Sequence, residues 1–387
     1  MKKSIIILLS VVMCMSVFAG CGNSANKDET IPTLEMNTDE NVKTTFGLVP
    51  FKEKQTLKIG FFTGSPLSYP FLFADKLNYF KELNIEIEYM PFTNGPGMME
   101  ANAEWDIAGA GVGGLANGMR AYGLKVIDIT DYEENLALFA RPDSPLAKDP
   151  KNPDNWKGTN WVYPAGTTAQ ATLVSALEKV DLSIKDIKST NMDVANALTG
   201  FKGGTGDGLA VWNAIAFAAE DEGFVRIGDS GTLGFPAPCG TVVSDKTLQE
   251  KRKLIETAIA VFHFTSEWIN ESDENKKQAA DWYLEDCKNE GVKADESIAK
   301  RVIDWYRGPT MAEYIDLYTT KSPDDAGLYK TRDLFQAEKD ILVGLDFFIS
   351  QGNYKPEART KFLDDGLIDP SVALGVKEML DNLEIAY

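Results

Sequence analysis

The sequence predicts an α/β protein with open, mainly parallel sheets divided between two lobes. In the first third of the chain, apolar runs of strand length alternate with segments of helical periodicity. This alternation is typical of a parallel sheet with helices on both faces. The globular part, from about Gln55 to Tyr387, is longer than chains that fold around a single hydrophobic core usually are. We therefore expect two lobes rather than one.

The chain begins with the layout of an export signal. Two lysines precede an apolar segment, residues 5–19, which is shorter than the roughly 20 residues of a membrane-spanning helix. The segment ends in VFAGC, with small residues directly before Cys21, as in a bacterial lipobox in which Phe18 replaces the usual leucine. We expect residues 1–20 to be a cleaved signal peptide and Cys21 to be lipidated. The alternative is a signal removed without lipidation.

A polar segment follows the signal. Residues 21–54 are low in large apolar side chains, and such a segment cannot bury enough surface to order itself. As a flexible coil it would have an end-to-end distance of about 30 Å. We expect a tether that holds a globular domain off a membrane, and no later stretch of the sequence approaches transmembrane length.

Strands and helices alternate through the first predicted lobe. We expect strands at residues 56–62, 85–92, 106–111, 124–130 and 136–142. We expect helices at residues 71–83, 95–105 and 114–123. The first of these helices has a clear apolar stripe, formed by Phe71, Ala74, Leu77 and Phe80.

A second unit of the same type begins after a turn-rich segment, residues 141–158. We expect strands at residues 160–166, 207–213, 223–229 and 240–245, and a helix at residues 167–180. From Lys246 onward the pattern is almost entirely helical, for example at residues 252–269 and at residues 337–352, where Gly352 is placed as a C-terminal cap.

Composition limits the function. The formal net charge of −19 argues against a nucleic-acid partner. His263 is the only histidine and lies in the apolar stretch AVFHF, so we expect a buried core residue. If His263 is in the core, no other histidine is available for a Ser-His or Cys-His triad or for a histidine-rich zinc site. Cys239 and Cys287 would be able to pair outside the cell, and the sequence does not decide whether they do.

Small residues stand at three strand-to-helix junctions: FFTGSPLSYP, GAGVGGLANG and YPAGTTAQAT. The first turn of a helix has unpaired N–H groups and a partial positive charge, and small residues let a ligand approach them. Gly109, Gly111 and Gly114 also spell the G-x-G-x-x-G of dinucleotide-binding folds. That reading is disfavoured because these glycines do not follow the first strand and open only a short helix. The alternative to ligand binding is that these glycines only form a tight turn.

The succession of segments over residues 57–245 resembles the solute-binding lipoproteins of ABC importers. The branch it is similar to serves nitrate, taurine, aliphatic sulfonates and thiamine-pyrimidine precursors. The most specific matches are DIAGAG at residues 106–111, GTT at residues 166–168 and AVW at residues 210–212. The extra glycines of FKGGTGDGLAVWN depart from the family pattern, as does Asn213, where an acidic or proline-flanked position is common.

The resemblance implies a periplasmic-binding-protein fold of type II, with two doubly wound lobes joined by a two-strand hinge and a helical C-terminal tail. Lobe 1 would comprise residues 55–138 and 242–387, and lobe 2 residues 139–241. The hinge would lie near Ala140 and Gly240. The implied ligand-binding residues are Gly64, Ser65, Tyr69, Gly111, Val112, Gly113, Thr167, Thr168, Trp212 and Asn213.

Each implied site residue has a structural alternative. The hydroxyls of Ser65, Thr167 and Thr168 would donate to an oxyanion, and the alternative for Thr167 is that it serves only as a helix cap. Trp212 and Tyr69 would offer aromatic walls. Trp212 would otherwise be a core residue, and Tyr69 would only precede a proline at a helix start.

The resulting hypothesis is a lipid-anchored, extracytoplasmic solute-binding subunit of an ABC importer. It would act as a monomer with a permease and its ATPase, and would need no cofactor, metal or catalytic residue. The solute would be small and anionic or polar: sulfonate-like or taurine-like, nitrate-like, or like a pyrimidine precursor. The alternatives are an extracellular enzyme or a ligand-sensing lipoprotein on the same scaffold.

Overall fold

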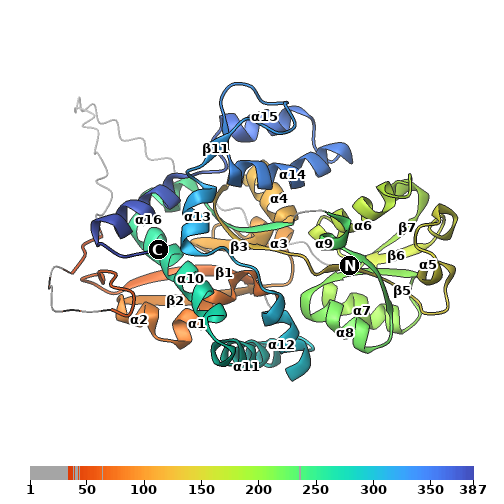
Figure 1. Cartoon of the computed structure of the whole chain (residues 1–387), viewed down its shortest axis with the longest axis horizontal. Helices are drawn as coiled ribbons and strands as arrows, with labels where there is room; N and C mark the ends of the chain where they lie inside the picture. Colours follow the sequence, from red (N-terminus) through yellow and green to blue (C-terminus); the bar gives the residue numbers. More distant parts are fainter. Residues whose placement is uncertain (1–33, 38, 40–41, 43, 63, 235–236) are drawn as a thin grey trace, which may run out of the picture. The chain divides into compact units, whose positions relative to one another are not determined.

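The computed structural model describes residues 34–37, 39, 42, 44–62, 64–234 and 237–387 (Figure 1). All of these residues fall within one compact unit. The predicted signal peptide at residues 1–20 and the predicted lipidation site Cys21 lie outside the described residues, and so does half of the predicted tether. Within the described part of the chain, no helix is both long and apolar enough to cross a bilayer.

The first of two five-stranded sheets has the order β2-β1-β3-β10-β4. Its strands are β1 (Gln55–Phe62), β2 (Ile85–Phe92), β3 (Ile107–Gly111), β4 (Lys125–Tyr132) and β10 (Pro238–Val243). Strand β1 is parallel to β2 and β3, whereas β10 runs antiparallel between β3 and β4. Strands β3 and β10 are almost entirely buried, which explains their continuous apolar sequences.

The second sheet repeats this arrangement with the order β7-β6-β8-β5-β9. Its strands are β5 (Leu136–Ala140), β6 (Asn160–Tyr163), β7 (Lys188–Asn191), β8 (Gly208–Trp212) and β9 (Val225–Asp229). Strand β6 is parallel to β7 and β8, and β5 is antiparallel to β8 and β9. Two open α/β sheets with this order are those of the type II periplasmic-binding-protein fold, as predicted.

The chain passes between the two sheets twice, and both crossings differ from the expected hinge positions. The first crossing is residues 133–135, between β4 and β5, and the second follows α9 (Ser230–Leu233) and precedes β10. Ala140 instead ends a strand inside the second sheet, and Gly240 lies in the middle of β10. The apolar residues that suggested these boundaries continue as buried strands, so the first crossing is the polar segment at residues 133–135 and the second comes before Pro238.

Helices surround both sheets. Those that join strands are α1 (Tyr69–Lys76), α2 (Tyr79–Glu82), α3 (Gly95–Glu100), α4 (Val112–Tyr122), α5 (Pro145–Lys148), α6 (Thr168–Glu178), α7 (Val194–Lys202) and α8 (Asn213–Asp221). The single helix expected at residues 71–83 is divided into α1 and α2, because Asn78 adopts a left-handed conformation with φ of 65°. Short 3₁₀ turns lie at Pro66–Ser68, Pro153–Asn155 and Ile184–Asp186.

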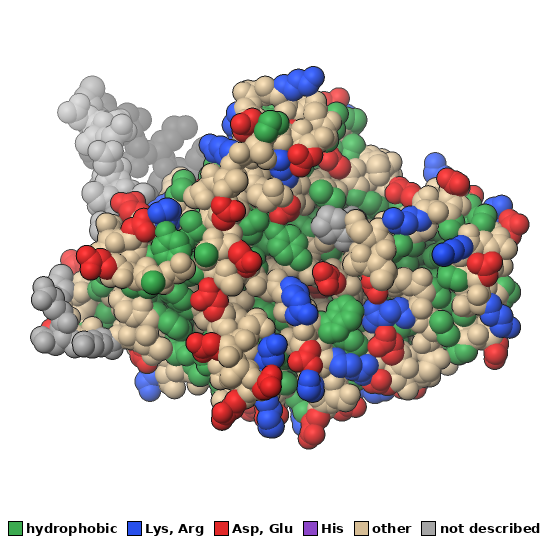
Figure 2. Space-filling model, viewed as in Figure 1, with side chains coloured by type: hydrophobic (Ala, Val, Ile, Leu, Met, Phe, Trp, Pro, Cys, Tyr) green, Lys and Arg blue, Asp and Glu red, His purple; other side chains and the backbone are tan. Residues whose placement is uncertain are grey.

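The C-terminal part is mainly helical, as predicted. It comprises α10 (Asp245–Glu271), α11 (Asp273–Asn289), α12 (Glu296–Trp305), α13 (Met311–Leu317), α14 (Gln336–Ser350), α15 (Glu357–Asp364) and α16 (Ser371–Asn382), with a ribbon of β11 (Lys321–Ser322) and β12 (Leu334–Phe335). On the face shown in Figure 2, acidic side chains are interspersed with lysines and arginines. Neither sign of charge therefore dominates that face, despite the net charge of −19.

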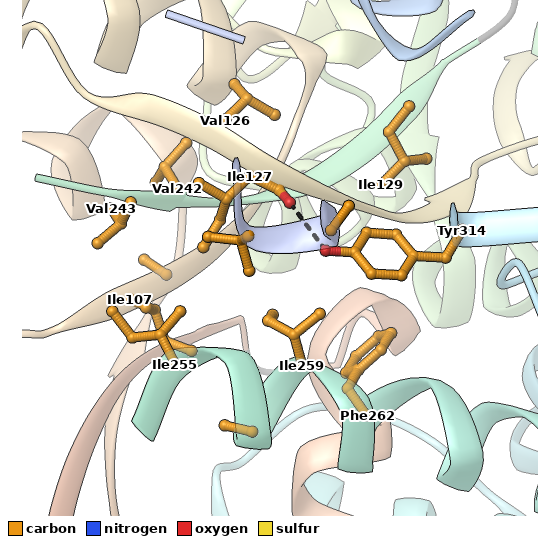
Figure 3. Packing of buried hydrophobic residues seen from close by; sticks show 14 of the residues in the cluster. Ile107, Val126, Ile127, Ile129, Val242, Val243, Ile255, Ile259, Phe262 and Tyr314 are labelled. Carbon is orange, nitrogen blue, oxygen red and sulfur yellow. Dashed lines mark hydrogen bonds between the residues drawn. The ribbon is translucent and has the colours of Figure 1, made fainter. Parts of the chain in front are cut away.

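The largest core cluster lies between the first sheet and helix α10 (Figure 3). Ile255 and Ile259 of α10 pack against aliphatic residues of the strands, and the Tyr314 hydroxyl donates to the carbonyl of Ile127 over 3.3 Å. His263 is fully buried in the same region, where its ring nitrogens contact Asp128 Oδ1 at 2.9 Å and the Pro309 carbonyl at 3.0 Å. This confirms that His263 is a core residue.

The end of the predicted tether is packed onto the first lobe. Leu48 and Phe51 are 2% and 0% exposed, and Phe51 forms an antiparallel bridge with Met36. Phe46 stacks on Phe264 of α10 with ring centroids 4.8 Å apart. The expectation of a flexible segment up to residue 54 is therefore wrong for residues 44–54, because their few apolar side chains are enough to cover a helix of the core.

Candidate functional site

A small cavity of about 30 Å³ lies between the two sheets. Its lining comes from both, and consists of Phe62, Ser65, Leu67, Gly95, Pro96, Gly111, Gly114, Glu133, Thr167, Thr168 and Trp212. A single water needs at least 10–15 Å³ on this measure, so the space has room for one or two waters. The two lobes are therefore closed on one another in this structure.

Three helix N-termini meet at this cavity. The N-cap residues of α4, α6 and α8 are Gly111, Thr167 and Trp212, and all three line the space. None of the three makes a side-chain capping bond to its helix. In α8 the N–H of Asn213 donates to the Asn135 carbonyl at 3.2 Å. The helix dipoles and the other first-turn N–H groups, which have no partner within their helices, give this region a partial positive charge. Such an arrangement is suited to an oxyanion or to another hydrogen-bond acceptor.

Two glycines allow the first turn of α4 to approach the second lobe. A Cβ at Gly113 would lie 2.7 Å from the carbonyl oxygen of Gly166 and 3.1 Å from Thr167 Cα. A Cβ at Gly111 would lie 2.8 Å from Thr168 Oγ1. The glycines of GAGVGG thus permit a close contact between the lobes. They follow β3, the third strand along the chain, whereas the glycines of a dinucleotide-binding motif follow the first strand and approach a phosphate.

Asn213 connects the lobes through its side chain. Its Nδ2 atom donates to Ser65 Oγ at 3.2 Å and to Glu133 Oε1 at 2.8 Å. Asn213 is the first residue of α8 and has φ of 46°, a left-handed conformation that is uncommon for residues other than glycine. Strain of this kind is retained where the surroundings impose it, often at functional sites.

Glu133 is a site residue that the sequence analysis did not identify. It lies in the first crossing segment, is 7% exposed and presents its carboxyl group to the cavity. Burial raises its pKa, while hydrogen bonds from Cys239 and Asn213 act in the opposite direction. Among the described residues that line the cavity there is no lysine, arginine or histidine. The only signal in the sequence is the acidic stretch DYEEN directly after a strand, which reads equally well as a solvated turn.

Asp131 adds a second buried carboxyl group beside Glu133. Its Oδ1 accepts hydrogen bonds from the backbone N–H groups of Arg307 at 3.1 Å and Tyr132 at 2.9 Å. Burial, and then the neighbouring charge of Glu133, raise the pKa of Asp131 to about 7. Burial also raises the pKa of the Cys239 thiol well above its usual value, so this cysteine is not an activated nucleophile.

The structure brings most of the implied ligand-binding residues together. Ser65, Gly111, Thr167, Thr168 and Trp212 line the cavity, Gly113 flanks it, and Asn213 forms hydrogen bonds to two of its lining residues. The side chain of Val112 instead belongs to an apolar cluster with Leu136, Ala171 and Ala237.

Tyr69 does not line the cavity. Its ring is fully buried in an aromatic cluster, its hydroxyl donates to Asp286 Oδ2 at 2.5 Å and it accepts from the N–H of Gly64 at 3.2 Å. Tyr69 therefore supports the loop that carries Gly64 and Ser65. Tyr69 is the first residue of α1 and precedes Pro70, as the structural alternative for this residue stated.

A larger cavity of about 350 Å³ adjoins the same loop and shares Trp212 with the small cavity. It is lined by Gly64, Pro91, Phe92, Thr93, Asp193, Val194, Ala195, Asn196, Trp212, Ile215, Glu290, Gly291 and Val292. These residues come from the loop after β1, from the end of β2 and the residue after it, from the start of α7, from β8 and α8, and from the segment after α11. The described side chains that line this cavity again include carboxylates and no basic group.

Two sheets of this topology, with a cavity between them at the ends of β3 and β8, define the class of periplasmic binding proteins by fold. No protein-family model matches the sequence. The chain is 23% identical over 320 residues, 77% of its length and 84% of the relative's, to a Brachyspira hyodysenteriae protein provisionally named an ABC transporter periplasmic binding protein.

Solved structures share the fold at low sequence identity. The alkanesulfonate-binding protein SsuA from Xanthomonas axonopodis pv. citri, bound to MOPS, is 18% identical, with a TM-score of 0.56 over 66% of this chain and 85% of that one. The periplasmic nitrate-binding protein NrtA from Synechocystis PCC 6803 is 12% identical, with a TM-score of 0.62 over 86% of this chain and 90% of that one.

Proposed function

We propose that this chain is the extracytoplasmic solute-binding subunit of an ABC importer. It would capture a small anionic or polar solute between its two lobes and deliver it to a permease that works with an ATPase. The observation that carries the proposal is the meeting of three uncapped helix N-termini, from two separate sheets, at one cavity. The name of the Brachyspira relative and the ligands of the structural neighbours support it.

Capture would proceed by opening and closing of the lobes. A solute of the size of taurine or an aminopyrimidine does not fit in about 30 Å³, so it would reach the three helix N-termini only when the lobes move apart. The two crossing segments, residues 133–135 and the segment between α9 and β10, are the connections about which the lobes would turn. A solute that contacts both lobes binds the closed form better and shifts the population toward it.

The chemistry of the site supports binding rather than turnover. His263 is occupied by Asp128 and the Pro309 carbonyl in the core, and the thiol of Cys239 is kept protonated by burial. The described residues contain no cluster of three or more His, Cys, Asp or Glu that would hold a metal. The groups that face the cavity are hydroxyls, helix N-termini, two aromatic rings, two smaller apolar side chains and one carboxyl group, which are suited to recognition.

The lipid anchor and the monomeric state belong to the same proposal. Cys21 would become the N-terminal, lipid-bearing residue after removal of residues 1–20, and would hold the protein on the extracytoplasmic face of the membrane. Metabolic labelling with an alkyne fatty acid tests this. We expect label on the wild-type protein and none on the Cys21→Ala variant, and label on both would refute lipidation at this position.

The experiment that tests the binding function is calorimetric titration of the purified chain lacking residues 1–21. The panel is nitrate, ethanesulfonate, taurine and 4-amino-5-hydroxymethyl-2-methylpyrimidine. We expect at least one to bind with a 1:1 stoichiometry and to raise the melting temperature, since a ligand of the native state stabilises it by mass action. Binding that persists unchanged in a Gly113→Leu variant, in which the lobes cannot close, would contradict a site between the lobes.

A further inference from the structure

The small cavity contains an unusual pairing of charges. Three helix N-termini provide positive potential on its walls, while Glu133 provides a carboxyl group that is 93% buried. The described lining includes no basic side chain that would pair with this carboxyl group. Its nearest donors are neutral, namely the amide of Asn213 at 2.8 Å and the thiol of Cys239.

Burial of a carboxyl group without a cationic partner is costly, because the charged form loses its hydration. This loss of hydration is the reason that burial raises the pKa of Glu133. A protein that needed only to bind a simple anion would be hindered by this group, since a second negative charge a few ångströms away would be repelled. The carboxyl group is useful if the solute itself supplies the missing cation.

We propose that the solute is a small zwitterion, whose oxyanion faces the helix N-termini and whose protonated amine pairs with Glu133. This inference rests on the proposed binding function and narrows its solute class. The oxyanion would meet the N–H groups at the start of α4 and α6, together with Thr168 Oγ1. The amine would replace Asn213 or join it at the carboxyl group. Amino sulfonates and amino carboxylates both have this chemistry.

The test uses two pairs of compounds that differ only in the amine: taurine with ethanesulfonate, and β-alanine with propionate. Affinities are measured by calorimetry on the wild type, on Glu133→Gln and on Glu134→Gln. The last variant is a matched control, because Glu134 is the neighbouring carboxylate and is exposed to solvent. Melting temperatures of the free proteins establish that each variant is folded.

We expect the wild type to bind the amine-bearing member of at least one pair about tenfold or more tightly than its partner, as a buried charged hydrogen bond provides. Glu133→Gln should remove most of that preference, and Glu134→Gln should keep it. Equal affinity for both members of each pair, or an unchanged preference in Glu133→Gln, would overturn the inference.

The outcomes separate this inference from the proposed function. Tight binding of nitrate, of amine-free ethanesulfonate, or of the neutral aminopyrimidine alone would refute the zwitterion and leave a solute-binding protein. If none of these compounds bound to the folded wild type, the result would count against both statements.

Discussion

Asn213 donates a hydrogen bond of 2.8 Å to Glu133 across the junction between the two lobes. Asn213 is the first residue of α8, which packs on the second sheet, and Glu133 follows β4 of the first sheet. The same amide group reaches Ser65 at 3.2 Å. One side chain therefore joins the first crossing segment, the loop after β1 and the start of α8. A movement of the lobes apart would break the hydrogen bond between Asn213 and Ser65.

Removal of the Asn213 amide should weaken the closed form. Asn213→Gly and Asn213→Ala both lose the two hydrogen bonds and leave Glu133 with fewer donors, a change worth about 1–3 kcal/mol. We expect solute affinity to fall about tenfold in both. Only the alanine variant also retains the strain of a positive φ, so it should melt at a lower temperature than the glycine variant. Equal solute affinity in wild type and both variants would show that the amide has no part in closure.

A side chain at Gly113 should prevent the lobes from closing. The new Cβ of Gly113→Ala would lie 2.7 Å from a backbone carbonyl of the other lobe, which cannot rotate away. Gly228→Ala is a suitable control, since its nearest neighbour would be a leucine side chain at 3.8 Å. We expect a larger radius of gyration in solution scattering and at least tenfold weaker solute binding for Gly113→Ala alone. A compact Gly113→Ala variant with full affinity would refute this role of the glycine.

The buried carboxyl group of Asp131 should make stability depend on pH. Its pKa is raised from 3.8 to about 7 in the folded protein, so the folded state retains a proton that the unfolded state has already lost. Stability from this group is therefore highest below pH 4 and falls as the pH rises to about 7, by at most about 4 kcal/mol.

The Asp131→Asn variant isolates that effect. Its amide oxygen can still accept from the N–H groups of Arg307 and Tyr132, and it carries no charge. We expect chemical denaturation at pH 8 to show a more stable variant than wild type, with little difference at pH 4.5. A wild type that gains stability steadily from pH 4.5 to pH 7, with a parallel curve for Asp131→Asn, would contradict the assignment.

Thiol reactivity reports on the burial of the two cysteines, which lie in different core clusters. Cys239 and Cys287 are both free and buried. Burial raises the pKa of Cys287 to about 11 and that of Cys239 well above its usual value. We expect neither thiol to react with a disulfide reagent such as DTNB in the native protein, and both to react after unfolding in guanidinium. Rapid reaction of one thiol in the native state would place it at an accessible surface.

The sequence predicted the strand-to-helix junctions well, because short-range patterns determine them. The expected strand at residues 106–111 and the small residues after it correspond to β3 and the start of α4. Strand β7 was missed, since KSTN is a polar edge strand without an apolar signal. The division of α1 from α2 at Asn78 depends on one left-handed residue, which periodicity does not detect.

The site was predicted in part for the same reason. Ser65, Gly111 and Thr167 belong to local motifs and were identified. Glu133 was not, because what makes it a site residue is its burial by distant segments. Its partner Asn213 is 80 positions away in the chain. A carboxylate in an acidic turn gives no local sign of such burial. The negative charge that Glu133 brings to the cavity could therefore be recognised only from the three-dimensional structure.

The N-terminal boundary of the folded domain provides the last prediction. A chain that begins at residue 55, as composition suggested, lacks Leu48 and Phe51, which are almost fully buried in the first core cluster. It also lacks the stacking of Phe46 on Phe264. Loss of one such aromatic side chain alone costs about 3–5 kcal/mol, so we expect the chain of residues 55–387 to unfold at a lower denaturant concentration than the chain of residues 34–387. In the longer chain, Phe51→Ala should reproduce most of the loss and Lys52→Ala almost none, since Lys52 is exposed in a surface ion pair with Glu35. Coincident unfolding curves for the two chains would mean that residues 34–54 add nothing to the stability of the core they cover.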